Sequence, residues 1–221
     1  MKYYPVNLDI NNRNCLVVGG GRVGERKIET LLKCGAIVTV VSIDVTKRIL
    51  SLSEKKAINL KQRPYRSSDI ENMFLVIGAT DDETLNRRIH TDAESINALC
   101  NIADRPRICN FILPSIVQRG DLVISISTSG KSPAFAKKLR KDLENEFGGE
   151  YAVFLQLMGA IRKKLLAEKH EPETHKPIFE KIIEENLVHM IAAEETEKID
   201  ALFEQVLGPE YTYGDLMGKD L

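Results

Sequence analysis

The hydrophobic residues of the first half of the chain fall into short runs separated by amphipathic segments. The runs are continuous and rich in β-branched residues, as in strands that a parallel sheet buries on both faces. Because helix-like segments alternate with the runs, the pattern predicts an α/β fold with helices on both faces of the sheet. We predict five strands, at residues 15–18, 37–41, 58–60, 74–77 and 99–102.

The pattern changes after residue 104. Two apolar runs, 111–114 and 122–126, are joined by the polar turn 118–121, which predicts a hairpin or an antiparallel addition to the sheet. Ser132 and Pro133 then predict the start of a helix, because serine caps free amides and proline suits the first helical position.

The remainder of the chain shows no strand pattern after the glycine pair 148–149, which is predicted to end that helix. Amphipathic runs at 151–168, 177–186 and 194–207 predict an acidic helical tail, interrupted by proline and glycine. The chain is therefore predicted to consist of three parts, residues 1–113, 114–150 and 151–221.

The composition fits a folded chain with one sizeable core. Of 221 residues, 43% are hydrophobic and 29% are charged, which excludes a disordered or fibrous protein. No segment approaches the roughly 18–20 uninterrupted apolar residues of a membrane-spanning helix, and the start of the chain lacks the apolar run of a secretory signal. We therefore expect a cytoplasmic protein with no membrane partner.

The formal net charge of −1 hides an uneven distribution. Residues 1–150 hold 23 Lys and Arg against 18 Asp and Glu, whereas residues 151–221 hold 8 against 14. The first part is therefore the expected place for an anionic ligand. Its positive excess is too small for the dense basic stripe that duplex nucleic acid needs, so we expect a small polyanionic ligand and no nucleic acid.

The cysteines and histidines show no spacing typical of a metal site, and no serine lies in a context that marks it as a catalytic nucleophile. Cys15, Cys34, Cys100 and Cys109 each lie in or beside an apolar segment, which predicts reduced, buried thiols. The 4 histidines have no H-x-x-x-H spacing, so surface or capping positions are expected for them. We predict no metal site.

The strongest single motif is the glycine-rich turn G-x-G-x-x-G between the first predicted strand and a helix. Gly19 permits the tight turn, Gly21 lets a pyrophosphate approach the backbone, and Gly24 allows close packing of helix and strand. Free amides near Arg22 and Val23 would point at the anion. Glycine turns also occur without a ligand, but this strand–turn–helix–strand context favours dinucleotide binding.

The ribose of such a cofactor is expected at the end of the second strand, at Ser42, Ile43 and Asp44. The spacing from the glycines selects Asp44, whereas the strand register places the usual acidic position nearer Ser42. No Lys or Arg occupies these three positions, which favours NAD over NADP. Lys47 and Arg48 are close enough to keep NADP open.

Two further strand ends carry candidate polar groups. Thr80 is predicted near the nicotinamide half of the cofactor, with Asp81 or Asp82 capping the next helix. Asp104 follows the fifth strand, at the sheet edge where open α/β folds bind ligands, and is a candidate acid–base group. Its alternative role is that of an ordinary turn aspartate, because Arg105 and Pro106 follow it.

The segment 127–133 combines hydroxyl groups, a glycine, a lysine and a helix start. Such a turn is able to hold a second anion through its free amides. A simple helix cap is the alternative interpretation, and both stay open on the residues alone. The side chains concerned are Thr128, Ser129, Lys131 and Ser132.

Taken together, six ordered motifs within residues 3–150 resemble the siroheme synthase N-terminal family. The motifs are YPVNLDI at 4–10, LVVGGGRVGERK at 16–27, GATDD at 78–82, CNIAD at 100–104, FILPS at 111–115 and STSGKSP at 127–133. The resemblance implies a Rossmann-type NAD-binding parallel sheet, then a small dimerisation segment at 114–150, and a C-terminal helical domain at 151–221. It also implies a homodimer.

The resemblance further implies a reaction, the NAD-dependent dehydrogenation of precorrin-2 to sirohydrochlorin. Asp104 matches the family's essential aspartate. Asn101, Thr128, Ser129, Lys131 and Ser132 would hold the carboxylates of the tetrapyrrole. Many bacterial members have serine where this chain has Thr128, which keeps the hydroxyl but changes its reach.

Two alternatives stay open on the sequence. Some family members also insert Fe²⁺ into sirohydrochlorin, and no compact set of metal ligands decides this for the present chain. A non-catalytic NAD-sensing module is less favoured, because it would not need the motifs at 101–104 and 127–133. Because fused members continue into a methyltransferase domain and this chain ends at Leu221, methylation is expected to come from another protein.

Overall fold

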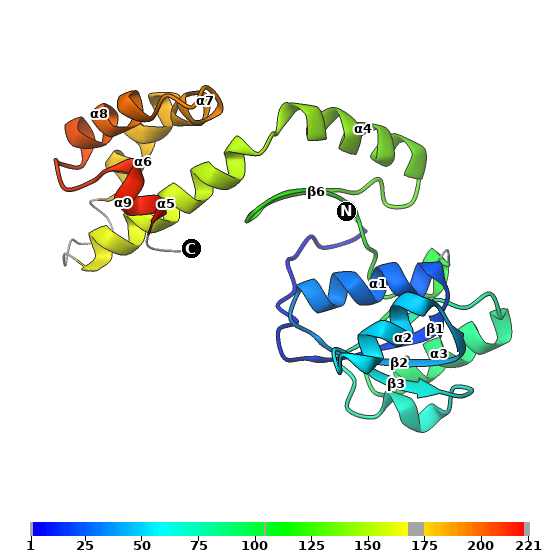
Figure 1. Ribbon diagram of the computed structural model, residues 1–221. Coiled ribbons are helices and arrows are strands. Elements are labelled where there is room, and N and C mark those ends of the chain that lie inside the picture. The colour runs from blue at the N-terminus through cyan, green and yellow to red at the C-terminus, as the bar shows by residue number, and fades with distance from the viewer. Residues whose placement is uncertain (1, 104, 168–174, 219–221) are drawn as a thin grey trace. The chain divides into compact units, whose positions relative to one another are not determined.

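A computed structural model describes residues 2–103, 105–167 and 175–218 (Figure 1). By its internal contacts the chain divides into two compact units, Met1–Leu113 and Pro114–Leu221. The first unit holds the glycine-rich turn, and the second holds the hairpin and the helical tail. Each unit is described by itself.

The first unit is built on a parallel sheet of five strands in the order β3-β2-β1-β4-β5. Strand order reverses beside β1, which pairs with β2 on one side and with β4 on the other. This confirms the predicted α/β fold and creates the switch point at which such sheets bind ligands. The strands are β1 (Asn14–Gly20), β2 (Ile37–Val45), β3 (Asn59–Gln62), β4 (Leu75–Gly78) and β5 (Leu99–Ile102).

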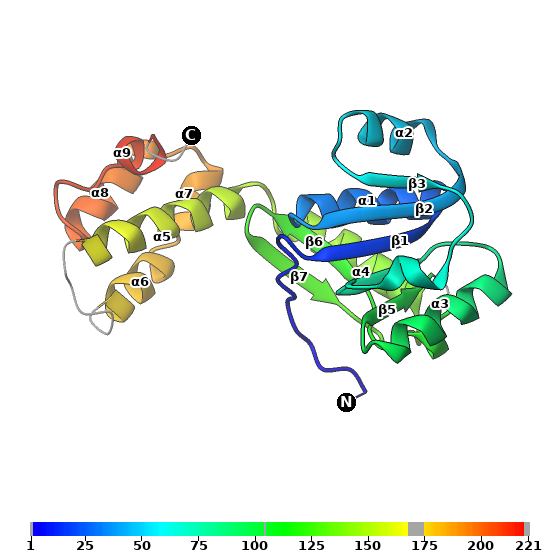
Figure 2. The same ribbon diagram turned by 90° about the horizontal axis from the view of Figure 1, so that it is seen from below.

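Helices cover both faces of this sheet (Figure 2). Successive side chains of a strand point to opposite faces, so Cys15 and Val17 pack with α1 and α2, whereas Leu16 and Val18 pack with α3. The continuous apolar runs of the sequence therefore reflect two separate layers of core. The helices are α1 (Arg22–Lys33), α2 (Lys47–Glu54) and α3 (Glu83–Ser95).

The second unit begins with an antiparallel pair, β6 (Ser115–Arg119) and β7 (Leu122–Ile126). Of the two predicted alternatives the hairpin is confirmed, because the pair forms its own two-stranded sheet rather than an addition to the parallel one. The predicted bounds of its first strand, 111–114, are wrong. Those residues are held elsewhere, because Asn110 bonds to the backbone of β5 and Phe111 packs on the core of the first unit.

The helical remainder of the second unit packs around two small cores. Val117, Ile126 and Ala136 form one core between the hairpin and α4 (Pro133–Glu146). The other core lies among the later helices, where Leu157 and Phe203 are fully buried. The later helices are α5 (Glu150–Ala167), α6 (His175–Glu184), α7 (Leu187–Ala192), α8 (Thr196–Val206) and α9 (Tyr213–Met217).

The structure bears on two expectations from the sequence, which concern membrane-spanning helices and the burial of the cysteines. Among the described residues no helix is long and apolar enough to cross a membrane. The cysteines are free thiols, but the prediction that all are buried is wrong, because Cys34 is exposed at the end of α1. A position beside an apolar run does not ensure burial when the residue ends its helix.

Candidate functional site

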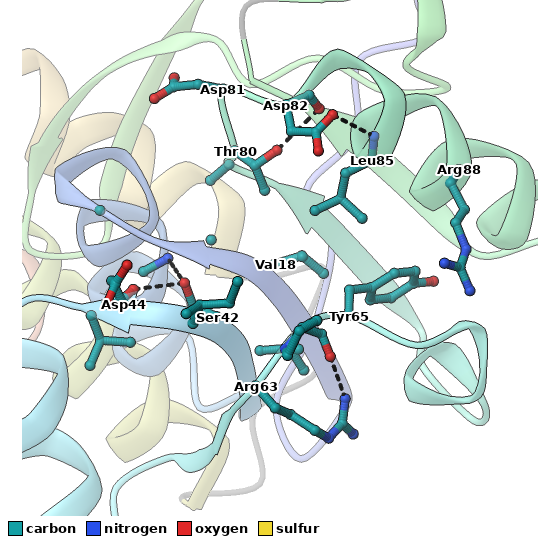
Figure 3. A pocket seen from close by; sticks show the side chains of 18 of the residues that line it. Val18, Ser42, Asp44, Arg63, Tyr65, Thr80, Asp81, Asp82, Leu85 and Arg88 are labelled. Carbon is teal, nitrogen blue, oxygen red and sulfur yellow. Dashed lines mark hydrogen bonds between the residues drawn. The ribbon is translucent and has the colours of Figure 1, made fainter.

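A pocket of about 780 Å³ opens at the carboxyl ends of β1, β2 and β4, at the switch point of the sheet (Figure 3). Its size lies in the range typical of cofactor sites. The pocket brings together six of the nine residues predicted to bind a dinucleotide, and these are Gly19, Gly21, Ser42, Ile43, Asp44 and Thr80.

The glycine-rich turn forms the floor of this pocket. Gly19 has a φ of +114°, which L side chains rarely adopt, and a Cβ there would overlap the carbonyl of Ala79. A Cβ on Gly24 would overlap the carbonyl oxygen of Gly19, so helix and strand meet at backbone distance. By contrast, a Cβ on Gly21 would meet nothing within 4 Å. Gly21 therefore leaves its backbone open to the pocket, which is the property that the approach of a pyrophosphate requires.

Helix α1 starts directly after this turn, with Gly21 as its N-cap and no side chain capping it. Arg22, Val23 and Gly24 form the first turn, where backbone amides have no partner within the helix. None of these three residues lines the pocket. Their predicted role in holding an anion therefore rests on backbone amides and on the helix dipole.

The end of β2 forms one wall of the pocket. The Ser42 hydroxyl accepts a hydrogen bond from the amide of Gly20 at 2.9 Å and donates one to the carbonyl of Asp44 at 2.7 Å. It thereby fills the register irregularity where β1 passes β2 between Val18 and Gly20. Strand β2 runs to Val45, beyond its predicted end, and leaves the exposed Asp44 carboxylate on the pocket wall.

The loop after β4 forms a second wall. Asp82 caps α3 by accepting the amide of Leu85 at 3.0 Å, which selects it over Asp81 as the capping residue. Thr80 lines the pocket and is held by Asn86, whose side-chain amide donates to the Thr80 carbonyl at 2.9 Å. The loop therefore fills both predicted roles: Thr80 lines the pocket, and Asp82 both caps the helix and lines the pocket.

The sequence interpretation missed a third wall, formed by the residues after β3 and by α3. Tyr65 donates a hydrogen bond to Asp92 at 2.9 Å, and the Arg88 guanidinium lies 5.6 Å from the centre of its ring. Burial, and then the bond to Asp92, raise the pKa of Tyr65 well above its usual range. The residues of this wall are Arg63, Pro64, Tyr65, Leu85 and Arg88.

One signal in the sequence was available for that wall. The carboxyl ends of parallel strands meet at one edge, so the residues after the third strand are expected beside those after the second. The polar Lys61 and Gln62 look like a loop, but they belong to β3. With the strand extended by two residues, Arg63 and Tyr65 become candidates.

The end of β5 carries the predicted acid–base group. Asp104 lies outside the described residues. Before it, the amide of Ala103 donates to the carbonyl of Gly78 at 2.8 Å, which continues the pairing of β5 with β4. The Asn101 side chain donates to the carbonyl of Phe111 at 3.0 Å, so its amide also anchors the segment that leaves the first unit.

The predicted substrate turn belongs to the second unit. The Ser132 hydroxyl caps α4 by accepting the amide of Phe135 at 3.3 Å, and the Thr128 hydroxyl braces the turn before it by accepting the amide of Ser132 at 3.2 Å. Ser129 has a φ of +53°, and Lys131 is exposed. The prediction that this turn and Asn101 hold one substrate stays a prediction.

In the described part of the chain, few residues are candidates for thiol chemistry or for metal binding. Burial raises the pKa of Cys15 to about 11 and that of Cys100 to about 12, which keeps both protonated. In residues 2–103, 105–167 and 175–218, no group of three or more His, Cys, Asp or Glu is placed to hold a metal ion.

Comparison with known proteins places these features in a family. A family model described as "NAD(P)-binding" matches residues 6–115, the unit that contains the pocket. A second one, described as "Sirohaem biosynthesis protein central", matches residues 119–146, which include the hairpin and α4.

Individual relatives agree with these matches. The chain is 33% identical over 207 residues to a siroheme synthase of Nitrosococcus oceani, an alignment of 94% of this chain with 44% of the relative. It is 32% identical over 208 residues to siroheme synthase 2 of Klebsiella pneumoniae, with 94% and 46% covered. The chain thus spans less than half the length of these curated relatives.

A solved structure extends the likeness over both units. The protein described as "SirC, precorrin-2 dehydrogenase" matches with a TM-score of 0.79 at 26% identity, covering 92% of this chain and 98% of that one. The two family models, the siroheme synthases and this structure all indicate the same family. The chain therefore belongs to the siroheme synthase N-terminal family.

Proposed function

We propose that this chain is an NAD-dependent precorrin-2 dehydrogenase that produces sirohydrochlorin. The observation that carries the proposal is the likeness to the precorrin-2 dehydrogenase SirC, which extends over nearly the whole chain. The pocket at the switch point supports the cofactor half of the proposal, because its open glycine and free helix amides suit a pyrophosphate.

The reaction requires the substrate, the cofactor and a proton acceptor to meet at one site. Precorrin-2 loses a hydride and a proton, and bound NAD⁺ supplies the hydride acceptor. The amides after Gly21 hold the pyrophosphate, and the Asp44 carboxylate accepts hydrogen bonds from the ribose hydroxyls. Thr80, after β4, flanks the nicotinamide half. Much of the rate enhancement would then come from positioning the substrate against the cofactor.

Asp104 is the proposed proton acceptor. In the chain it follows the end of β5 by two residues, and in this proposal the nicotinamide half binds on the side of the sheet that β4 and β5 form. In this proposal Asn101, Thr128, Ser129, Lys131 and Ser132 hold the carboxylate rim of the tetrapyrrole. The exposed Lys131 and the start of α4 supply positive charge for that role.

The test uses purified protein with precorrin-2 and NAD⁺. Formation of NADH together with the absorption of sirohydrochlorin is the expected result. Asp104→Asn should reduce turnover by at least about a hundredfold while leaving NAD⁺ binding unchanged. Asp121→Asn, in the hairpin turn, is the matched control. NAD⁺ binding without turnover in the unaltered protein would contradict the proposal and favour a sensing role.

The proposal includes a homodimer that acts in the cytoplasm, with residues 114–150 as the dimerisation segment and residues 151–221 as a separate helical domain. A two-stranded sheet is marginal in water and has unpaired edges. The face of the hairpin that points away from α4 exposes Ile116 and Val123, each with more than 40% of its surface accessible. A second copy would cover these side chains.

Light scattering after gel filtration tests the dimer. Val123→Asp is expected to give a monomer, because burying an unpaired carboxylate in an interface is costly. Ile183→Asp is the matched control, since Ile183 is 56% exposed on α6, outside the dimerisation segment. A monomeric unaltered protein would overturn this part of the proposal.

A further inference from the structure

A single buried carboxylate, that of Asp69, organises the third wall of the pocket. Its side chain is only 1% exposed. One carboxylate oxygen accepts from Lys61 at 2.9 Å and from Arg63 at 2.5 Å. The other accepts from Arg63 at 2.7 Å and from the backbone amide of Arg66 at 2.9 Å. The segment from Arg63 to Arg66 therefore takes its shape from this one group.

Arg63 is the member of this cluster that reaches the pocket. It directly follows Gln62, which pairs with Ser42 in the sheet, so it flanks the end of β2 where the ribose is expected. Its guanidinium donates to Asp69 through both terminal nitrogens. One of these nitrogens also donates to the carbonyl of Pro64 at 2.8 Å, the bond that Figure 3 shows. Both protons of that nitrogen are thereby used.

Arg63 keeps an ionised partner at all ordinary pH values, and it shares that partner with Lys61. Its hydrogen bonds, with those from Arg66 and Lys61, hold the pKa of the Asp69 carboxyl well below its usual range despite burial. The other arginine on the pocket wall, Arg88, donates to Ser67 at 2.8 Å and lies 3.9 Å from the Asp92 carboxylate. Among the described residues that line the pocket, the two cations thus each have a carboxylate partner outside it.

This arrangement bears on the choice between two cofactors. NADP differs from NAD by a 2′-phosphate on the adenosine ribose, and a guanidinium binds phosphate through two parallel hydrogen bonds. Arg63 has the right chemistry and the right place, but Asp69 and the Pro64 carbonyl take three of its five N–H groups, so its end-on fork is not open to a phosphate. We propose that Asp69 is a positioning residue that sets cofactor specificity: by holding Arg63 it makes the pocket select NAD and reject NADP. This inference rests on the proposed function, which supplies the dinucleotide.

The test compares the Kd of NAD⁺ with that of NADP⁺ by titration calorimetry. In Asp69→Asn the guanidinium loses its charged partner, and the ratio of the NADP⁺ Kd to the NAD⁺ Kd should fall by at least about tenfold. Adding Arg63→Met to that variant should abolish the gain. Lys61→Met is the matched control: Lys61 contacts the same carboxylate but does not line the pocket, so the ratio should stay unchanged.

A second variant keeps the test decisive if Asp69→Asn alone does not fold. Asp69→Asn combined with Lys61→Met removes one charge of each sign, which leaves no unpaired lysine and no change in net charge. It should show the same gain in NADP⁺ binding. Circular dichroism identifies which variants fold, and thermal shifts with each nucleotide give an independent measure of binding.

The outcomes separate this inference from the function beneath it. If the unaltered protein binds neither nucleotide, the proposed function is contradicted and the inference falls with it. If the protein binds NAD⁺ and a folded Asp69→Asn variant keeps the original ratio, the inference alone is overturned. A gain that persists without Arg63 would also overturn it, because the phosphate would then be bound elsewhere.

Discussion

The floor and the third wall of the pocket are built in opposite ways. The glycine-rich turn is local: Gly19 and Gly24 lie five residues apart, and their backbones touch because neither has a side chain. The wall after β3 is held by bonds from Lys61, Arg63 and Arg66 to the buried Asp69, a residue of the next 3₁₀ turn. The floor depends on the absence of side chains at Gly19 and Gly24, and the third wall depends on the buried charge of Asp69.

This difference predicts how substitutions in the floor and in the third wall should affect stability and binding. Steric exclusion at a glycine is insensitive to pH and salt, and any side chain violates it. A buried ion pair responds to protonation and leaves uncompensated charge when one partner is removed. The effects of substitutions in the floor and in the third wall should therefore differ in size and in their dependence on pH.

The largest effect is expected in the glycine turn. Gly24→Val should abolish NAD⁺ binding and lower the free energy of unfolding by about 3 kcal/mol, because its Cβ would overlap the Gly19 carbonyl. Gly21→Ala should weaken NAD⁺ binding but cost less than about 1 kcal/mol of stability, since a Cβ there meets open space. Urea unfolding and calorimetry measure both, and equal losses of stability would contradict the close approach.

An intermediate effect is expected at Asp69. Because the folded state lowers the pKa of its carboxyl, the stabilisation is complete above the ordinary aspartate value of about 4 and is lost as the pH falls through the lowered pKa. Asp69→Asn should cost about 2 kcal/mol at pH 7, and the gap to the unaltered protein should narrow in acid. Glu83→Gln, an exposed partner of Arg87, is the control and should change nothing measurable.

The smallest effect is expected in the second unit, at Ser132. Ser132→Ala should cost about 1 kcal/mol, because the cap on the Phe135 amide is lost. Ser132→Asp keeps the cap but adds negative charge where substrate carboxylates are proposed to bind. It should therefore raise the KM for precorrin-2 without loss of stability. An unchanged KM would mean that Ser132 is a helix cap only.

Much of the fold was predictable because its signals are local. Runs such as 15–18 and 37–41 identified strands, and Ser132 with Pro133 identified the start of α4. Boundaries were less predictable. Strand β2 continues to Val45 through polar residues because Ser42 bonds back to Gly20, and the residues after Asn110 follow β5 because the Asn110 side chain bonds to it. Both depend on partners distant in the sequence.

The sequence by itself determined the turn that suits a pyrophosphate, since glycine positions and a following helix start are local properties of the chain. It also placed Asp44 near the end of a strand. Only the tertiary structure decided that Arg63 shares the pocket and that Asp69 holds it. The physical reason is that a charge shows its effect only when its partner and its burial are known, and folding fixes both.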